Sequence, residues 1–380
     1  MKKVIISILF FAVGLGLSAD DWPQWRGPNR DGISRETGLL QAWPSAGPRR
    51  VWLSRDIGIG YSAPVVAKGR LFVLGTKGGK EQLFAKEAKG GKTLWTAPLG
   101  GILSNNWGDG PRGAATVDGD QVYALGAKGG LICANVGDGK VNWRVELVKD
   151  LGGKVPGWGY TESVLVDGNL VLCTPGGNQG AVAALNKQTG QVAWRSRQFT
   201  DGAQYSSIIP VDHNGARQYI QLTMNSLVGL DARSGTVLWK SRWGGKTAVI
   251  PTPIFSSGNV YISSGYNAGC KLVSIGADNQ VRDVWQNSVM KNHHGGVILY
   301  SKHLYGFSDG RGLICQDLAS GREAWSGNRR TLAKGAITIA DGMIIGVNES
   351  NGDVILAPAT PAGFREAGRF RLQPQSKIRS

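Results

Sequence analysis

A short turn that ends in glycine recurs along the chain, and a tryptophan follows each copy four residues later. The copies start at an acidic or amide residue and run Glu87–Gly91 to Trp95, Asn135–Gly139 to Trp143, Asn186–Gly190 to Trp194, Asp231–Gly235 to Trp239 and Asp317–Gly321 to Trp325. A sixth copy ends at Trp285, although its turn, 277–281, has lost the glycine. Asp or Asn caps the backbone two residues on and glycine takes a positive φ, so each turn is tight. Self-similarity at this spacing predicts a repeat fold.

Each repeat carries a second turn upstream of the first. Asp118-Gly119, Asp167-Gly168 and Asp341-Gly342 each separate two short apolar runs. Asp-Gly between apolar runs is a strong β-hairpin signal. Each unit therefore reads as four short strands over roughly 40–50 residues, a length typical of one blade of a β-propeller.

Seven such units cover most of the chain. They start near Ser62, Gly113, Thr161, Ser206, Pro251, Gly295 and Gly335. The repeated tryptophans are Trp52, Trp95, Trp143, Trp194, Trp239, Trp285 and Trp325. We expect each of them on an outer strand, with its ring between neighbouring blades and its indole N–H on a backbone carbonyl. A closed ring removes exposed strand edges, so the pattern predicts an all-β, seven-bladed propeller of four-stranded antiparallel blades.

The way the ring closes is the open point of this prediction. Residues 49–53 read as an outer strand that has no blade before it and that would join the last blade. The last unit also contains a candidate outer strand of its own, 364–371. An eighth, partial blade is therefore the alternative.

The first nineteen residues read as a signal peptide, with Lys2 and Lys3 before an apolar stretch and Leu17-Ser18-Ala19 as the cleavage site. A retained membrane anchor is the alternative, and no cysteine follows the stretch to carry a lipid. We divide the chain into signal peptide 1–19, N-terminal extension 20–48, propeller 49–371 and basic tail 372–380. The mature protein is expected to be periplasmic or secreted, without a transmembrane segment, and monomeric.

Charge and cysteine usage add to this assignment. Loss of Lys2 and Lys3 leaves 41 basic against 27 acidic residues, a net charge of +14. A basic surface suits anionic polymers or acidic proteins, although it can also serve solubility alone; no nucleic-acid partner is expected. Cys133 and Cys315 occupy the same place in different repeats, which favours buried thiols over disulfides for all four cysteines.

The Asp/Asn-x-x-Thr/Ser-Gly-x-x-x-Trp turns resemble those of pyrroloquinoline-quinone-like β-propeller proteins over residues 50–370. The segment 21–32, Asp-Trp-Pro-Gln-Trp-Arg-Gly-Pro-Asn-Arg-Asp-Gly, is similar to the start of an exported bacterial subgroup. That subgroup is named after the propeller lipoprotein of the outer-membrane β-barrel assembly machinery. The resemblance implies a protein-binding scaffold of the cell envelope, with envelope proteins or peptides as partners. Because the same repeat builds quinoprotein dehydrogenases, it also implies the alternative of an alcohol or sugar dehydrogenase with pyrroloquinoline quinone and calcium.

Polar loops precede the innermost strands, and in a propeller these loops meet at one mouth. The residues that they bring there are Asn105, Trp107, Asp109, Arg112, Trp158, Tyr160, Glu162, Tyr205, Lys291, His293, His294 and Lys334. Carboxylates, cations and aromatic rings around one cavity would suit a small polar ligand, an acidic peptide or a sugar. The plain alternative is that these loops only connect blades.

Catalytic and metal signals are weak in these loops. Adjacent residues on an extended chain point apart, so His293-His294 is a poor zinc pair. A lone loop carboxylate such as Asp109 or Glu162 is more often a solvated group than a general base. We therefore predict no catalytic residue, no metal and no cofactor. The segment Trp22–Trp25 is expected to pack against the ring floor, or else to bind a partner.

The sequence as a whole predicts an exported protein-binding or scaffold propeller, with envelope or outer-membrane protein assembly as the expected role. The alternatives are a quinone-dependent alcohol or sugar dehydrogenase and a module that binds carbohydrate or anionic polymer.

Overall fold

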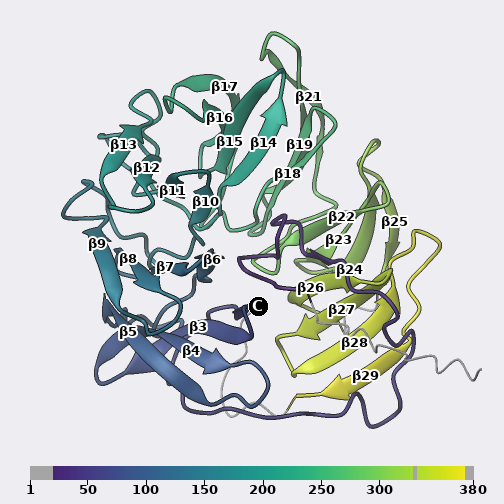
Figure 1. The fold of residues 1–380 in the computed structure, drawn as a ribbon. Helices are drawn as coiled ribbons and strands as arrows, with labels where there is room; N and C mark the ends of the chain where they lie inside the picture. The colour runs from purple at the N-terminus through teal and green to yellow at the C-terminus, as the bar shows by residue number, and fades with distance from the viewer. Residues whose placement is uncertain (1–19, 328–331, 373–380) are drawn as a thin grey trace, which may run out of the picture.

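Seven antiparallel sheets stand around a common centre in the computed structural model, which describes residues 20–327 and 332–372 (Figure 1). Over these residues the chain forms strands and no helix. Each sheet is a blade in which the chain moves from the innermost strand outward. The prediction of a seven-bladed propeller is confirmed. The signal peptide and most of the basic tail lie outside the described residues.

The first four blades are consecutive four-stranded meanders. Blade 1 comprises β2 (Val65–Ala67), β3 (Arg70–Lys77), β4 (Lys80–Glu87) and β5 (Thr93–Gly101). Blade 2 comprises β6 (Thr116–Asp118), β7 (Gln121–Leu125), β8 (Gly130–Asn135) and β9 (Val141–Glu146). Blade 3 comprises β10 (Leu165–Asp167), β11 (Leu170–Cys173), β12 (Ala183–Asn186) and β13 (Val192–Arg195). Blade 4 comprises β14 (Ile209–His213), β15 (Ala216–Leu222), β16 (Ser226–Asp231) and β17 (Val237–Arg242).

The last three blades follow the same plan until the ring closes. Blade 5 comprises β18 (Ile254–Ser256), β19 (Asn259–Ser264), β20 (Gly269–Ile275) and β21 (Val281–Asn287). Blade 6 comprises β22 (Val297–Tyr300), β23 (His303–Ser308), β24 (Gly312–Asp317) and β25 (Glu323–Ser326). Blade 7 comprises β26 (Gly335–Ala340), β27 (Met343–Asn348), β28 (Asp353–Pro358) and β29 (Gly368–Arg371), and it gains a fifth strand, β1 (Ile33–Ser34).

The tryptophans of the repeat connect neighbouring blades. In six cases the indole N–H donates, at 2.7–3.1 Å, to a carbonyl of the blade that follows the tryptophan along the chain; Trp52 does so from a segment before blade 1, and the other five do so from a blade. The pairs are Trp52 to Ala88, Trp95 to Val136, Trp143 to Lys187, Trp194 to Ala232, Trp285 to Leu318 and Trp325 to Thr360. Five of these rings also cover the glycine that ends the turn of the next blade. A Cβ at Gly235, for example, would lie 2.3 Å from the Trp194 ring. Only glycine therefore lets the ring approach the turn so closely.

Trp239 is the exception among the seven. The next blade has Asn279, with a φ of 62°, in a turn that lacks the closing glycine. Trp239 instead donates its N–H to Gln218 Oε1 of its own blade, at 2.8 Å, and its ring fills the space over Gly229, where a Cβ would lie 2.2 Å away. The side chain is 4 % exposed. The repeat thus adapts where the glycine is missing, because the indole N–H finds another buried acceptor.

Apolar cores hold each blade against the next. Six clusters of buried residues join blades 1 and 2, 2 and 3, 3 and 4, 4 and 5, 5 and 6, and 6 and 7. Within the described ranges, no such cluster joins blade 7 to blade 1. All four cysteines are buried and free. The seam between the last and first blades is therefore held in a different way.

The expected closing strand at residues 49–53 is wrong: these residues belong to no strand. The outer strand of blade 7 is β29, which pairs with β28, and seven sheets account for all blades in the described chain. The N-terminal segment contributes β1 at the centre, where Ile33 and Ser34 run parallel to β26. β29 and not 49–53 is the outer strand of blade 7, because β29 follows β28 directly in the chain and pairs with it antiparallel without a long-range connection.

The N-terminal extension crosses the inside of the ring and contacts six blades (Figure 1). Trp22 forms a bridge with Val66 of blade 1, and Pro23 accepts from the Val117 amide of blade 2. Trp25 donates to Thr252 Oγ1 beside blade 5, at 3.0 Å. The Arg30 guanidinium donates to Ser163 O of blade 3, Arg26 donates to Val297 O of blade 6, and β1 lies on blade 7. We call residues 20–34 the plug.

Two buried ionisable side chains, Arg30 and Glu162, lie near each other where the plug meets blade 3. Arg30 is 3 % exposed and Glu162 is 2 % exposed. Glu162 accepts from the amide and the hydroxyl of Thr174. Burial raises the pKa of Glu162 to about 7, although the Thr174 hydrogen bonds and the charge of Arg30 oppose that rise. Burial also lowers the pKa of Arg30, to about 10.

Replacement of Gly235 by alanine tests the tryptophan contact. Gly168→Ala is the matched control, because both glycines have a positive φ but no atom lies within 4 Å of a Cβ at position 168. We expect Gly168→Ala to lower the free energy of unfolding by about 1 kcal/mol through backbone strain. Gly235→Ala should cost about 2 kcal/mol more, because its Cβ displaces the Trp194 ring. Urea unfolding measures both, and equal losses would contradict the proposed contact.

Glu162 should make stability depend on pH. Its folded-state pKa of about 7 lies above the usual 4.5. The folded protein therefore holds the proton more tightly, and this stabilisation is complete below about pH 4.5 and is lost as pH rises through about 7. The full loss corresponds to about 3 kcal/mol. Urea unfolding of the wild type and of Glu162→Gln from about pH 5 to pH 8 isolates the contribution of Glu162 to the pH dependence of stability. If the variant keeps the pH slope of the wild type, Glu162 is not its source.

Candidate functional site

The loops before the innermost strands enclose a cavity of about 610 Å³ at one mouth of the ring. All seven blades contribute to its lining, and Trp25 of the plug lies on it as well. Its aromatic side chains are Trp25, Tyr61, Trp107, Trp158, Tyr205 and Tyr266. Its basic and imidazole side chains are Arg112, His293, His294 and Lys334, and the described lining contains no Asp or Glu. The cavity is therefore aromatic and cationic, and its size suits a ligand as large as a few side chains.

The structure brings together seven of the twelve predicted residues. The residues that line the cavity are Trp107, Arg112, Trp158, Tyr205, His293, His294 and Lys334. The other five lie outside the lining; they are Asn105, Asp109, Tyr160, Glu162 and Lys291.

Those five residues shape the loops instead. Asp109 accepts from Ser104 Oγ and from the Asn105 amide, both at 2.9 Å, and the Asn105 side chain accepts from the Trp107 amide. Tyr160 is 1 % exposed and donates to Pro175 O at 3.0 Å. Lys291 Nζ donates to Asn267 Oδ1 at 3.1 Å. Glu162 is buried and accepts hydrogen bonds from Thr174.

Arg112 and two aromatic residues form the wall at blades 1 and 2. The Arg112 guanidinium lies 5.4 Å from the centre of the Tyr61 ring. Its terminal nitrogens donate to Gly108 O and Gly110 O, so the loop itself fixes the guanidinium. Gly108 permits this packing, because a Cβ there would lie 2.3 Å from Tyr61 Oη. Trp107 remains 63 % exposed at the rim, where it can contact an incoming ligand.

A second aromatic wall comes from blades 3 and 4. The rings of Trp158 and Tyr205 meet edge to face with centroids 5.7 Å apart. The Trp158 amide also donates to Tyr205 Oη at 3.3 Å. Such edge-to-face pairs add attraction beyond area burial and leave ring surface available for contact with a ligand. This wall is suited to packing against an aromatic or aliphatic group of a ligand.

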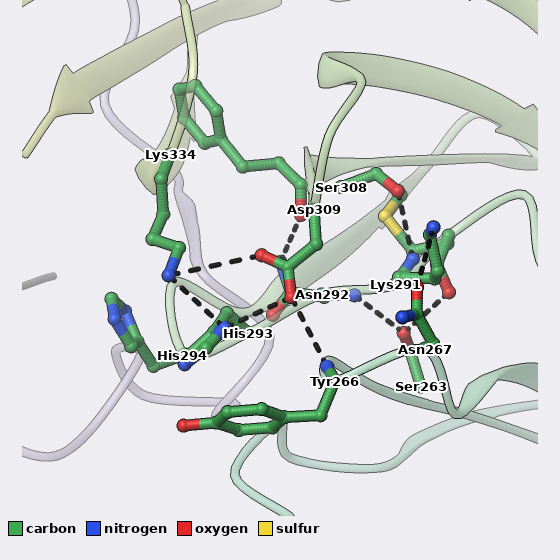
Figure 2. A network of polar contacts seen from close by, with 12 residues as sticks. Ser263, Tyr266, Asn267, Lys291, Asn292, His293, His294, Ser308, Asp309 and Lys334 are labelled. Carbon is green, nitrogen blue, oxygen red and sulfur yellow. Dashed lines mark hydrogen bonds and ion pairs between the residues drawn. The ribbon is translucent and has the colours of Figure 1, made fainter. Parts of the chain in front are cut away.

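A polar network forms the third wall, at blades 5 to 7 (Figure 2). His293 Nδ1 lies 3.0 Å from Asp309 Oδ2 and 3.2 Å from Lys334 Nζ. The Tyr266 amide donates to the same carboxylate, and the Tyr266 ring lies 4.3 Å from the His293 ring, centre to centre. One ring nitrogen either donates to Asp309 or accepts from Lys334, but not both at once. Lys334 can therefore exchange His293 for another acceptor.

Two carboxylates outside the cavity lining, Asp309 and Glu349, partly balance the positive charge of this network. Burial raises the pKa of Asp309, but the hydrogen bond from His293 and the charges of His293 and Lys334 outweigh it, so the pKa lies below its usual value. Lys334 Nζ is 4.0 Å from Asp309 Oδ1. His294 Nε2 lies 3.4 Å from Glu349 Oε2, whose side chain is 8 % exposed. Both carboxylates lie outside the cavity lining, which keeps the cationic and imidazole groups on the cavity side.

Sequence reasoning missed Tyr61, Tyr266 and Asp309. Tyr61 directly precedes the first repeat unit, which starts near Ser62, and the residues directly before five other repeat units also line the cavity; these are Arg112, Tyr205, Ile250, His294 and Lys334. The register of the repeat was therefore a usable signal for Tyr61. Tyr266 and Asp309 come from turns within blades 5 and 6, between β19 and β20 and between β23 and β24. No pattern in the sequence connects those turns to the mouth.

The residues present do not fit a calcium-bound quinone. Calcium takes six to eight oxygen ligands, commonly from carboxylates, and the described lining has neither Asp nor Glu. No group of three or more His, Cys, Asp or Glu in the described chain is placed to hold a metal ion. No redox step is therefore assigned to these side chains.

In the described part of the chain, no helix has the length and apolar character needed to cross a membrane.

Known structures share this fold. The crystal structure of BamB from Moraxella catarrhalis is 15% identical with a TM-score of 0.60, and the match covers 84% of this chain and 86% of that one. Quinohemoprotein alcohol dehydrogenase from Comamonas testosteroni is 12% identical with a TM-score of 0.63, and the match covers 92% of this chain and 73% of that one. Identities this low support the propeller architecture alone.

Sequence comparison is more specific. The outer membrane protein assembly factor BamB of Yersinia pestis is 23% identical over 305 residues, which cover 74% of this chain and 70% of the relative. The sequence model of the family described as "Outer membrane protein assembly factor BamB" matches residues 84–327. That match spans more than half of the sequence, and the matched residues form blades built from the quinone-type repeat. This chain therefore belongs to the BamB-like family of pyrroloquinoline-quinone-type propellers.

Proposed function

We propose that this chain is a non-catalytic binding propeller of the cell envelope, which holds a segment of a partner polypeptide during outer-membrane protein assembly. The observation that carries the proposal is the mouth cavity, whose described lining combines six aromatic side chains with Arg112, Lys334 and two histidines and includes no carboxylate. Such a lining is complementary to a peptide that bears an aromatic side chain next to acidic ones.

Each wall contributes a different part of this recognition. Trp158 and Tyr205 offer a flat apolar face, and Arg112 holds a positive charge over Tyr61 on another wall. Lys334 stands at the third wall, hydrogen-bonded to His293. A carboxylate of the ligand can take over the Lys334 hydrogen bond while His293 donates to Asp309. Charge-assisted bonds of this kind are roughly twice as strong as neutral ones.

Family membership supports the assembly role. The matching family model and the Yersinia pestis relative both carry the name outer membrane protein assembly factor. The signal-like start of the sequence agrees with delivery to the envelope. The dehydrogenase alternative has less support, because the lining lacks the oxygen ligands that calcium requires.

Peptide binding tests the cavity. A capped synthetic peptide with phenylalanine between aspartates should quench the fluorescence of Trp107 and Trp158, and a matched peptide with asparagines should bind about tenfold more weakly. Lys334→Gln should weaken binding of the aspartate peptide about tenfold, because a charged donor is lost. Lys89→Gln removes the same charge at an exposed turn and should leave binding unchanged. Equal affinity for both peptides would contradict the proposed charge recognition.

Deletion of the gene tests the role in the cell. We expect lower amounts of β-barrel proteins in the outer membrane, with recovery on expression of the wild type or Lys89→Gln and with weaker recovery on expression of Arg112→Gln/Lys334→Gln. Quantitative proteomics of outer-membrane fractions measures this. Purified protein supplied with pyrroloquinoline quinone and calcium should reduce no dye with alcohols or sugars. Dye reduction, or unchanged outer-membrane composition after deletion, would overturn the proposal.

A further inference from the structure

Residues 43–57 pass from blade 7 to blade 1 across the one seam that has no apolar cluster in the described chain; we call them the strap. Figure 1 shows this dark segment running along the rim of the ring from β29 toward blade 1. Both ends are anchored. On blade 7 the Trp43 ring packs 5.3 Å from Phe370 and its amide donates to Ala367 O.

The other end is anchored on blade 1 through three residues, Trp52, Asp56 and Ile57. Trp52 donates to Ala88 O and covers Gly91, as the repeat tryptophans do. Asp56 lies 2.6 Å from Lys86 Nζ and accepts from Thr93 Oγ1 at 2.6 Å. Ile57 O accepts from the Thr76 amide. The strap is therefore held in place on two blades.

The middle of the strap, residues 49–55, has the character of a strand without a strand partner. Exposure alternates from Val51 to Arg55: Val51 is 73 % exposed and Leu53 is 57 % exposed, whereas Trp52 and Ser54 are partly buried and the Trp52 indole N–H bonds to blade 1. This is the two-residue period of a β-strand. In the described structure no backbone N–H or C=O of residues 49–55 forms a hydrogen bond within the chain. An extended, apolar edge of this kind is a template for pairing with another chain.

Charge indicates which chain fits. Arg49, Arg50 and Arg55 are exposed and flank Val51 and Leu53. Asp56, the nearest acid, is already paired with Lys86. Opposite charges across paired strands stabilise the pairing and like charges oppose it. The complementary segment is a strand with alternating apolar and acidic residues.

We propose that residues 49–55 form a docking edge to which a partner polypeptide adds an acidic, apolar-alternating β-strand. Main-chain hydrogen bonds supply the affinity, and Val51, Leu53 and the arginines select the sequence. This surface is separate from the mouth cavity. Because the edge is fixed at both ends before binding, little conformational entropy is lost there on docking.

Hydrogen exchange on the full-length mature protein tests the edge. The probe is a capped synthetic peptide of alternating valine and glutamate. Two matched probes serve as controls: one carries lysine in place of glutamate, and the other carries an N-methyl group on every amide. Amides 49–55 should exchange fast in the free protein and become at least tenfold slower with the glutamate probe. Neither matched probe should protect them, because one repels the arginines and the other lacks the amide donors.

Variants separate this edge from the cavity. Val51→Asp should weaken probe binding about tenfold through loss of apolar contact and charge repulsion. Val192→Asp, at a 48 % exposed valine on β13, is the matched control and should bind as the wild type does. Lys334→Gln should also keep strand binding, so failure of the cavity proposal and failure of this one are distinguishable.

Three results would overturn the proposed edge. Slow exchange of amides 49–55 in the free, dilute protein would mean that they are already paired. Protection that grows with protein concentration and without peptide would identify a second copy of this chain as the occupant. Equal protection by the glutamate and lysine probes would remove the charge selection on which the partner assignment rests.

Discussion

Contact between each repeat tryptophan and the next blade is the constraint on which the ring depends. A blade alone leaves both faces of its sheet uncovered, and stacking against neighbours buries them. The indole ring over a glycine and the N–H on a carbonyl set the distance and the register between blades. Trp239 shows that the contact requires the glycine: the neighbouring turn lacks it, and the Trp239 ring packs within its own blade with Gln218 as its hydrogen-bond acceptor.

Closure of the ring is the task of the N-terminal segment. The tryptophan series begins with Trp52, which lies on the strap and not on a blade, so at this seam the strap supplies the indole contact that an outer strand supplies at other seams. The plug then fills the centre and brings Arg26 and Arg30 into the interior, where carbonyls of distant blades accept their hydrogen bonds. Burying guanidinium groups is costly unless acceptors are present. Besides these carbonyls, Gln24 Oε1 accepts from Arg30 and Asp31 O accepts from Arg26 within the plug.

The same segment connects architecture to binding. Trp25 of the plug lines the cavity, so the plug forms part of the candidate binding surface as well as filling the centre of the ring. The strap leaves an unpaired edge on the rim. Both surfaces are positively charged and apolar, and both are fixed by contacts with several blades. Fixed surfaces of this kind suit recognition of flexible acidic chains, since the partner alone is ordered on binding.

Local chemistry in the sequence determined the blades, whereas long-range placement was decided only in three dimensions. Glycine turns and Asp-Gly hairpins act over four or five residues, so Gly235 with Trp239, and Asp341 with Gly342, could be recognised in the sequence as turn and strand signals. The repeat register also placed Arg112, Tyr205 and Lys334 at the mouth. By contrast, 49–53 carries a strand pattern with no strand partner, because pairing depends on which edge lies within reach. Glu162, predicted at the mouth, turns inward to Thr174 beside Arg30. Asp309 reaches His293 from another turn. Such contacts depend on burial and charge neutralisation among residues far apart in the chain, and the spacing of residues along a sequence does not encode them.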